Sequence, residues 1–263
     1  GRRFHAKIDK NIVLPASYST AFDPTTFGNR TINTSLPVGR IAGTQNVSPS
    51  GAATYTIPIQ LPPGRAEMIP NLSVAYNSQA GSGFLGVGWD IAGLSAIARV
   101  NNTLYHDAKV EAVNLNSDDR FALDGNRFIA TTGAYGNSGT IYATEIETFS
   151  KITSNGTAGT GPDWFLVETK DGIKMEYGNT SGNTSNSKVL GTGSASVLIW
   201  YISKIYDNYG NYVSFHYAND DNGHRISEVR YTGNGTNEPY NKIRFIYDQK
   251  EDMNNIYVSG EKI

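Results

Sequence analysis

The sequence predicts an all-β protein in which many short antiparallel strands and hairpins form a curved sheet or a sandwich. Sixteen tyrosines and ten phenylalanines occur beside 28 glycines and abundant Thr, Asn and Ser, a composition typical of short strands joined by turns. Several segments alternate apolar and polar residues with a period of two, which is the pattern of a strand with one buried face. Asp-Gly and similar pairs separate these segments and are strong hairpin signals.

The stretch 50–100 carries the clearest strand pattern, and we expect the rest of the chain to be organised around it. Apolar residues occupy the odd positions of 55–61, and Pro62-Pro63-Gly64 then ends this first strand, because proline cannot donate to a ladder and glycine allows the turn. A second alternating strand covers 72–77. A glycine-rich exit follows and ends at Trp89-Asp90, so the glycines are expected to let the chain turn sharply and bring Trp89 inward.

Two hairpins are predicted further along the chain. Residues 120–129 form strand, turn and strand around Asp124-Gly125, and residues 164–177 do the same around Lys170-Asp171-Gly172. The segment 179–196 is rich in Gly, Ser, Thr and Asn and is expected to be a surface loop. These features extend the β pattern well beyond residue 100.

The first 45 residues differ from the rest. Pro15, Pro24 and Pro37 are spaced so that no long helix could pass through them, and we expect an extended arm. Gly1 replaces an initiator methionine, and no apolar segment of a signal peptide follows Arg2-Arg3. The strand pattern also stops midway at 258–263. Both observations suggest that the sequence is part of a longer polypeptide.

Composition excludes several classes of function. With no cysteine there are no disulfides and no thiolate metal sites. A net charge of −2 argues against nucleic acid as a partner, because phosphate binding needs a clustered basic surface. No apolar run reaches the roughly 18 residues of a membrane-spanning helix.

The segment 51–89 contains the motifs Gly51-Ala52-Ala53, Ile57-Pro58-Ile59, Pro62-Pro63-Gly64 and Gly88-Trp89. With these motifs it resembles the opening domain of the bacterial SpvB family, which is shared with the B component of insecticidal toxin complexes. Similar sequence motifs continue downstream, so the resemblance extends from about residue 39 to the end of the chain. The matching phrases are Gly51-Ala52-Ala53, Tyr55, Ile57-Pro58-Ile59, Pro62-Pro63-Gly64, Pro70, Leu72-Ser73, Tyr76-Asn77-Ser78, Gly83, Leu85-Gly86, Gly88-Trp89, Leu123-Asp124-Gly125, Thr144-Glu145-Ile146-Glu147 with Phe149, and Thr169-Lys170-Asp171-Gly172.

One internal repeat is visible near the C-terminus. The motif Lys204-Ile205-Tyr206-Asp207 recurs as Arg244-Phe245-Ile246-Tyr247-Asp248. The pattern resembles the YD, or RHS, repeat. Tyrosine would pack on the sheet face, while Asp207 and Gly210-Asn211 form a tight turn. Two copies fall short of the roughly three that a solenoid needs, so this part is expected to lead into an RHS-like β-spiral.

The resemblance divides the chain into three parts and implies a structural function. They are an extended N-terminal arm at 1–45, an SpvB-like β domain at 46–196, and the start of RHS-like hairpin repeats at 197–263. The implied protein is a secreted or cell-surface, non-catalytic bacterial domain that helps form and close a β-shell around a toxic C-terminal cargo. Its implied partners are the remainder of that shell, the cargo and other toxin-complex subunits. We also expect an open sheet edge near the C-terminus.

A cell-surface adhesion or glycan-binding β module is the alternative, because exposed aromatic rings beside Asn/Asp-rich loops suit sugars. No catalytic, cofactor-binding or metal-binding residue is assigned in either case. The resemblance adds that the Asp-Pro-x-Gly repeats of aspartyl self-cleavage are missing, since Thr25 and Thr26 follow the single Asp23-Pro24.

Two motifs resemble catalytic or nucleotide-binding signatures but favour structural interpretations. The run 81–86 matches G-x-G-x-x-G, yet a dinucleotide site also needs a helix at the third glycine, and Gly88 and Gly93 disfavour one. Glu145-Ile146-Glu147 is an E-x-E pair, which in some SpvB proteins belongs to a separate C-terminal ADP-ribosyltransferase domain. Here both carboxylates are expected on one exposed face of a strand.

Metal binding is likewise not favoured. The four histidines, His5, His106, His216 and His224, share no metal-ligand spacing. The segment 219–223 is rich in oxygen ligands and could hold calcium. It lacks the ordered spacing and the distal glutamate of an EF-hand, so we expect a hairpin turn.

Overall fold

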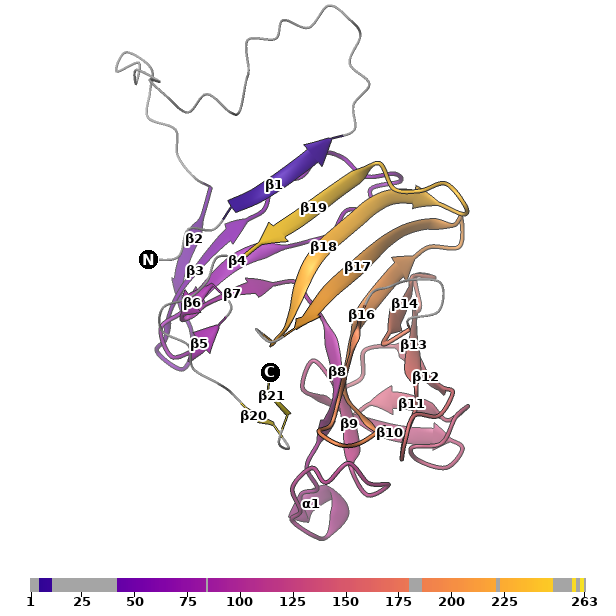
Figure 1. The fold of residues 1–263 in the computed structure, drawn as a ribbon. Helices are drawn as coiled ribbons and strands as arrows, with labels where there is room; N and C mark the ends of the chain where they lie inside the picture. The colour runs from indigo at the N-terminus through magenta and orange to yellow at the C-terminus, as the bar shows by residue number, and fades with distance from the viewer. Residues whose placement is uncertain are drawn as a thin grey trace, which may run out of the picture.

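The computed structural model describes residues 5–10, 42–83, 85–179, 186–220, 223–247, 257–258 and 261–262 (Figure 1). It confirms the all-β prediction, because these residues form two large antiparallel sheets, a small hairpin and one helix of four residues, α1 (Leu104–Asp107). The small hairpin pairs β20 (Tyr257–Val258) with β21 (Glu261–Lys262). No helix among the described residues is long and apolar enough to cross a membrane.

Eight strands of the larger sheet close into a barrel. The strands from β8 to β14 are neighbours in sequence order, and β16 then pairs with both β14 and β8 to complete the ring. In Figure 1 the barrel forms the lower right part of the molecule, with α1 at its foot. The barrel strands are β8 (Ala96–Val100), β9 (Arg120–Leu123), β10 (Asn126–Thr132), β11 (Ile141–Thr144), β12 (Ser150–Asn155), β13 (Trp164–Thr169), β14 (Lys174–Tyr177) and β16 (Val197–Tyr206).

Strand β16 belongs to the barrel and to an open sheet at once. Along one edge it pairs first with β15 (Lys188–Leu190) and then with β14, while along the other it pairs first with β8 and then with β17 (Asn211–Asp220). At the crossover the Tyr201 amide donates to the Ser187 carbonyl at 2.8 Å, and the Ile202 amide donates to the Ser95 carbonyl at 3.1 Å. The middle of β16 therefore ties the barrel to the open sheet.

The open sheet continues from β16 through β17, β18 (Gly223–Asn234), β19 (Asn241–Ile246) and β1 (His5–Lys10) (Figure 1). Because side chains alternate across a strand, its two faces differ in character. Val213 and Val229 lie on the apolar face and are almost completely buried. The opposite face carries polar residues.

The smaller sheet covers this apolar face. Leu72 and Ile91 belong to the same hydrophobic cluster as Val229, and the Tyr231 hydroxyl donates to the Pro62 carbonyl at 3.2 Å. The segment that was expected to organise the chain thus packs on the open sheet. Its strands, in spatial order, are β2 (Thr44–Val47), β3 (Ala53–Pro58), β4 (Ser73–Asn77), β7 (Trp89–Ala92), β6 (Gly86–Val87) and β5 (Ser82–Gly83).

Aromatic side chains fill the barrel. Trp200, Phe121 and Phe165 have at most 1 % of their surface exposed. The Trp200 ring meets Phe165 edge to face at a centroid distance of 5.0 Å and Phe121 at 5.4 Å. Such edge-to-face pairs are favourable beyond the area that they bury, so this cluster is the centre of the barrel core.

Both predicted hairpins are confirmed. In the first, Asp124 and Gly125 connect β9 to β10 with positive φ angles of 49° and 84°, the conformation required by a tight two-residue turn. In the second, Gly172 has a φ of 82° in the turn between β13 and β14. The pattern of short apolar runs around Asp-Gly was therefore sufficient to place these turns.

The turn of the first Tyr-Asp repeat also forms as expected. The Asp207 carboxylate accepts hydrogen bonds from the backbone amides of Tyr209 and Asn211 at 2.8 and 2.9 Å, and from the Asn211 side chain at 2.7 Å. Burial opposes ionisation, but these hydrogen bonds hold the pKa of Asp207 below its usual value. The second copy lies on β19, and its Asp248 is outside the described residues.

Two expectations need correction. The segment 179–196 is not entirely a loop, because Val189 packs into the core and β15 pairs with β16. The sheet edge near the C-terminus is not open at β19, because β1 of the N-terminal arm pairs along it from His5↔Ile246 to Lys10↔Asn241. Both strands depend on long-range partners that composition does not reveal. The rest of the arm lies outside the described residues, and the three-part division of the chain remains a prediction.

Replacing Trp200 by alanine should destabilise the protein by about 3–5 kcal/mol, because it leaves a large cavity in the barrel core. Chemical denaturation of the wild type and the variant measures this difference. Tyr105→Ala is the matched control, since Tyr105 is 88 % exposed, and it should change stability by less than about 0.5 kcal/mol. Equal effects of the two substitutions would contradict the assigned core.

Asp207→Ala should cost about 1–2 kcal/mol, because it leaves the turn amides without their charged acceptor. Since the folded-state pKa is lowered, the stabilisation is present above the ordinary aspartate pKa and is lost as the pH falls through the lowered value. Denaturation at several pH values tests both statements. Asp171→Ala is the control, since Asp171 lies in a turn without a side-chain hydrogen bond among the described residues; an equal loss there would contradict the assignment.

Candidate functional site

The glycine-rich run 81–86 forms strands rather than a nucleotide-binding turn. Residues 82–83 are β5 and residues 86–87 are β6, which pair as an antiparallel hairpin, and no helix begins at Gly86. Gly88 has a φ of 76°, and a β-carbon there would lie 2.6 Å from the Tyr76 ring. The Trp89 ring lies 5.1 Å from the Tyr76 ring. The glycines thus serve the close packing expected around Trp89.

The E-x-E pair does not form a two-carboxylate site. The expectation that Glu145 and Glu147 share one face of a strand is wrong, because β11 ends at Thr144 and both residues lie in the following loop. Glu145 contacts the His106 ring at 2.9 Å, whereas Glu147 accepts the Phe149 amide at 2.6 Å. The two carboxylates therefore have separate local partners. The positive φ of Phe149 marks a turn that the alternation of residues did not reveal.

The histidines are not brought together. His106 lies on α1, His216 on β17 and His224 on β18, while the side chain of His5 is outside the described residues. His224 stacks on Tyr201 at a centroid distance of 4.5 Å and contacts the Asn186 carbonyl at 2.6 Å, and burial lowers its pKa. Among the described residues no group of His, Asp and Glu could hold a metal ion.

The oxygen-rich segment 219–223 lies where the β17–β18 hairpin changes direction, because β17 ends at Asp220 and β18 begins at Gly223. Asp220 opposes Gly223 in the register, and the Asp220 carboxylate binds Arg225 at 2.7 and 2.8 Å. Asp221 and Asn222 lie outside the described residues. The side chain of Asp220 is thus engaged by a cation of the same hairpin.

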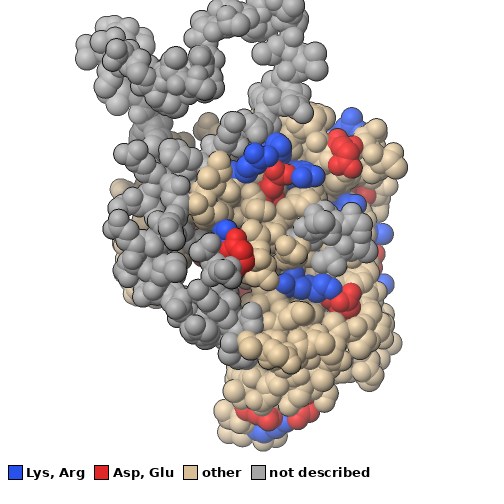
Figure 2. Space-filling model, viewed as in Figure 1, with Lys and Arg blue, Asp and Glu red and all other residues tan. Residues whose placement is uncertain are grey.

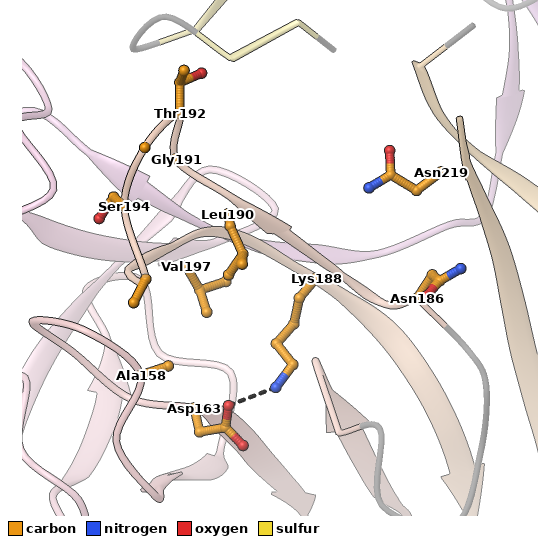
Figure 3. A pocket seen from close by; sticks show the side chains of 12 residues that line it. Ala158, Asp163, Asn186, Lys188, Leu190, Gly191, Thr192, Ser194, Val197 and Asn219 are labelled. Atoms are coloured by element: carbon orange, nitrogen blue, oxygen red, sulfur yellow. Dashed lines mark hydrogen bonds and ion pairs between the residues drawn. The ribbon is translucent and has the colours of Figure 1, made fainter. Parts of the chain in front are cut away.

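A concave site lies beside the end of the barrel at which β16 begins (Figure 3). It is an open hollow of about 820 Å³. The barrel contributes Asp163, the connection from β15 to β16 contributes small polar residues, and Asn219 comes from the end of β17. Its lining residues are Ala158, Asp163, Asn186, Lys188, Leu190, Gly191, Thr192, Gly193, Ser194, Ala195, Val197 and Asn219.

The polar groups of this hollow contact one another and the barrel. The Lys188 ammonium binds the Asp163 carboxylate at 2.5 Å, as Figure 3 shows. The Trp200 indole donates to the Asp163 carbonyl at 3.0 Å, which links this ion pair to the barrel core. The Ser194 hydroxyl accepts the Ser196 amide at 3.0 Å. None of these described contacts joins a nucleophile to a base, as acyl transfer would require.

An ion pair inside the barrel was not predicted. The Arg99 guanidinium binds the Asp119 carboxylate at 3.0 Å, and both side chains are only 1 % exposed. Arg99 also donates to the Val197 carbonyl at 2.7 Å. Gly161 leaves the room for it, since a β-carbon there would lie 2.6 Å from the guanidinium. Burial lowers the pKa of Arg99, although the attraction of Asp119 opposes that shift.

The surface carries no field of a single sign on the face shown in Figure 2. Lys and Arg lie beside Asp and Glu over the described part of this face. Lys109 near α1, for example, binds Glu111 at 2.8 Å and Asp118 at 2.7 Å. This mixture does not provide the continuous basic surface that phosphate backbones require.

The described strands and their two antiparallel sheets define an all-β domain. A family model, the Salmonella virulence plasmid 65kDa B protein family SpvB, matches residues 47–250. The chain belongs to the SpvB family. No curated protein sequence matches it.

Solved structures have the same fold. The crystal structure of TcdB2-TccC3-TEV matches with a TM-score of 0.61 at 14 % identity, over 89 % of this chain and 12 % of that chain. The Photorhabdus luminescens Tc holotoxin pore with the mutation TccC3-D651A matches with a TM-score of 0.54 at 17 % identity, over 78 % of this chain and 11 % of that chain. This chain thus spans about a tenth of the toxin chains that it matches.

The N-terminal domain of effector protein SpvB from Salmonella typhimurium strain LT2 is also similar. It has a TM-score of 0.50 and 24 % identity, over 66 % of this chain and 63 % of that chain. At these identities the structural matches establish the shared fold, and the SpvB family predicted from the sequence motifs is confirmed by the family match.

Asp119→Ala should destabilise the protein by about 3–5 kcal/mol, because it leaves the Arg99 charge buried and unpaired. Thermal and denaturant unfolding measure the loss. The double variant Arg99→Met/Asp119→Ala should be more stable than Asp119→Ala alone, since no buried charge remains. Asp118→Ala is the control, because the neighbouring Asp118 is exposed. A double variant less stable than the single variant would contradict the assigned pairing.

Proposed function

We propose that this chain is a non-catalytic wall segment of a secreted, toxin-complex-like bacterial protein. Its sheets form part of a β-shell that encloses a toxic C-terminal cargo, and its partners are the rest of that shell, the cargo and further toxin-complex subunits. The proposal rests on membership of the SpvB family and on the fold shared with the TcdB2-TccC3 and Tc holotoxin chains.

The continuous larger sheet is the observation that carries the proposal. Thirteen strands are connected by hydrogen bonds, and β16 passes from the closed barrel into the open sheet. A wall must be extended and also stiff, and a barrel fused to a sheet meets both needs. The smaller sheet covers one face of the open sheet and so hides its apolar residues.

Sheet edges must also be protected in such a wall, because an exposed edge can template aggregation. The outer edge of β19 pairs with β1, and one edge of β8 is taken by β16. Among the described strands, β1 is then the outer strand of the larger sheet, where a neighbouring part of the shell could pair.

The direct experiment uses the native polypeptide that carries this domain. Peptide mapping should show a chain several times longer than 263 residues with further Tyr-Asp repeats, and electron microscopy should show a hollow particle. Limited proteolysis should leave the downstream segment uncut in the intact particle. A native chain without a cavity, or a downstream segment cut as fast as a free peptide, would contradict the proposal.

A variant of this domain, used in the same proteolysis experiment, tests whether the domain forms part of the wall. Trp200→Ala weakens the barrel and should speed cleavage of the enclosed segment, because the wall opens more often. Tyr105→Ala changes an exposed side chain and should leave the cleavage rate unchanged. Glycan binding by a chain that encloses nothing would instead support the adhesion module.

A further inference from the structure

A second, polar pocket lies on the open sheet, on the face opposite the smaller sheet. It has a volume of about 360 Å³, within the range of small-molecule sites. Its floor comes from β14, β16, β17 and β18, and its wall comes from the connection that follows β18. Its lining residues are Glu176, Asn179, Ser203, Lys204, Tyr212, Ser214, His216, Arg230, Gly235 and Glu238.

The strand register explains why the sheet is hollowed here. Ser214 stands directly opposite Lys204 on one neighbouring strand and opposite Arg230 on the other. Opposed residues in antiparallel strands have β-carbons about 4.5–5.5 Å apart. A small hydroxyl therefore lies between two long cationic side chains, of which Arg230 also binds the Glu228 carboxylate of its own strand. The space above the hydroxyl is the pocket.

The floor of the pocket favours an anion. The Ser214 hydroxyl lies 3.2 Å from the His216 Nε2 atom, so the two polar groups face the same space. The Lys204 ammonium has no ion pair among the described residues and instead lies 4.5 Å from the centre of the Tyr212 ring. The Tyr212 ring packs directly on Gly233, since a β-carbon on Gly233 would lie 2.3 Å from this ring. Lys204 is thus positioned without a contact ion pair among the described residues, although Glu176 stands opposite it in the register of β14.

The wall of the pocket favours a cation. The Glu238 carboxylate makes no hydrogen bond or ion pair with the described residues. On the floor, Glu176 of β14 adds a second carboxylate, of which one oxygen accepts the Asn179 side chain at 2.7 Å. A ligand with several negative charges would meet repulsion here, whereas a single carboxylate linked to an ammonium group would match both sides.

We propose that this pocket binds a small zwitterion, an amino acid. Its carboxylate lies above Ser214 between Lys204 and Arg230, and its ammonium group faces Glu238. The inference is independent of the proposed shell function, because it depends only on the pocket's own charges. Ser214 and His216 serve here as hydrogen-bonding groups, and no covalent step is involved.

Calorimetric titration of the protein tests the proposal. The probes are the L-amino acids, then glycine, β-alanine and 4-aminobutyrate, which separate the two charges progressively. Acetate and methylamine carry one charge each. We expect saturable binding of at least one zwitterion, at least tenfold tighter than acetate or methylamine, because only the zwitterion uses both sides of the pocket. Equal affinity for acetate, or no saturable binding of any amino acid, would overturn the proposal.

Two variants separate the two sides of the pocket. Lys204→Met should weaken zwitterion binding at least tenfold, and Glu238→Gln should weaken it similarly while leaving acetate binding unchanged or stronger. Lys151→Met is the matched control, since Lys151 is a 55 % exposed lysine on β12, outside the pocket. Melting temperatures confirm that each variant is folded. Undiminished binding in Lys204→Met, or equal loss in Lys151→Met, would overturn the assignment.

Discussion

The pairing of β16 on both of its edges is the constraint on which the rest of the structure depends. One strand closes the barrel through β8 and β14 and starts the open sheet through β17. Its side chains follow this division, because Trp200 fills the barrel while Tyr201 stacks on His224 and packs against Tyr217. A change in register here would move each side chain to the wrong face.

This constraint also explains how the remaining chain is used. The open sheet needs cover on its apolar face, and the segment that contains Leu72 and Ile91 supplies it. Its other face is free to carry charge, so the row through Lys204, Ser214 and Arg230 can form a polar pocket. A structural wall and a small-molecule site are therefore compatible, because they use opposite faces of one sheet.

Much of the fold could be predicted from local patterns, whereas features made by distant residues could not. The turns at Asp124-Gly125 and Asp207 are encoded by adjacent residues and follow from turn chemistry. Barrel closure depends on β8 meeting β16 about a hundred residues later, and nothing local signals it. The buried pair of Arg99 and Asp119 was missed because charged residues suggest a surface. In the polar pocket, the Ser-x-His spacing on a strand was an available signal, but Lys204 and Arg230 meet it only through the register.

Native-state hydrogen exchange of the β16 amides tests the central claim most directly. If β16 unites the barrel and the open sheet, the Tyr201 and Ile202 amides should exchange only through global unfolding. Amides in β13 and in β17 should then show the same opening free energy, since cooperative units exchange together. If the amides of β17 to β19 exchanged much faster while the barrel amides stayed fully protected, the barrel and the open sheet would be two independent units. That result would contradict the account.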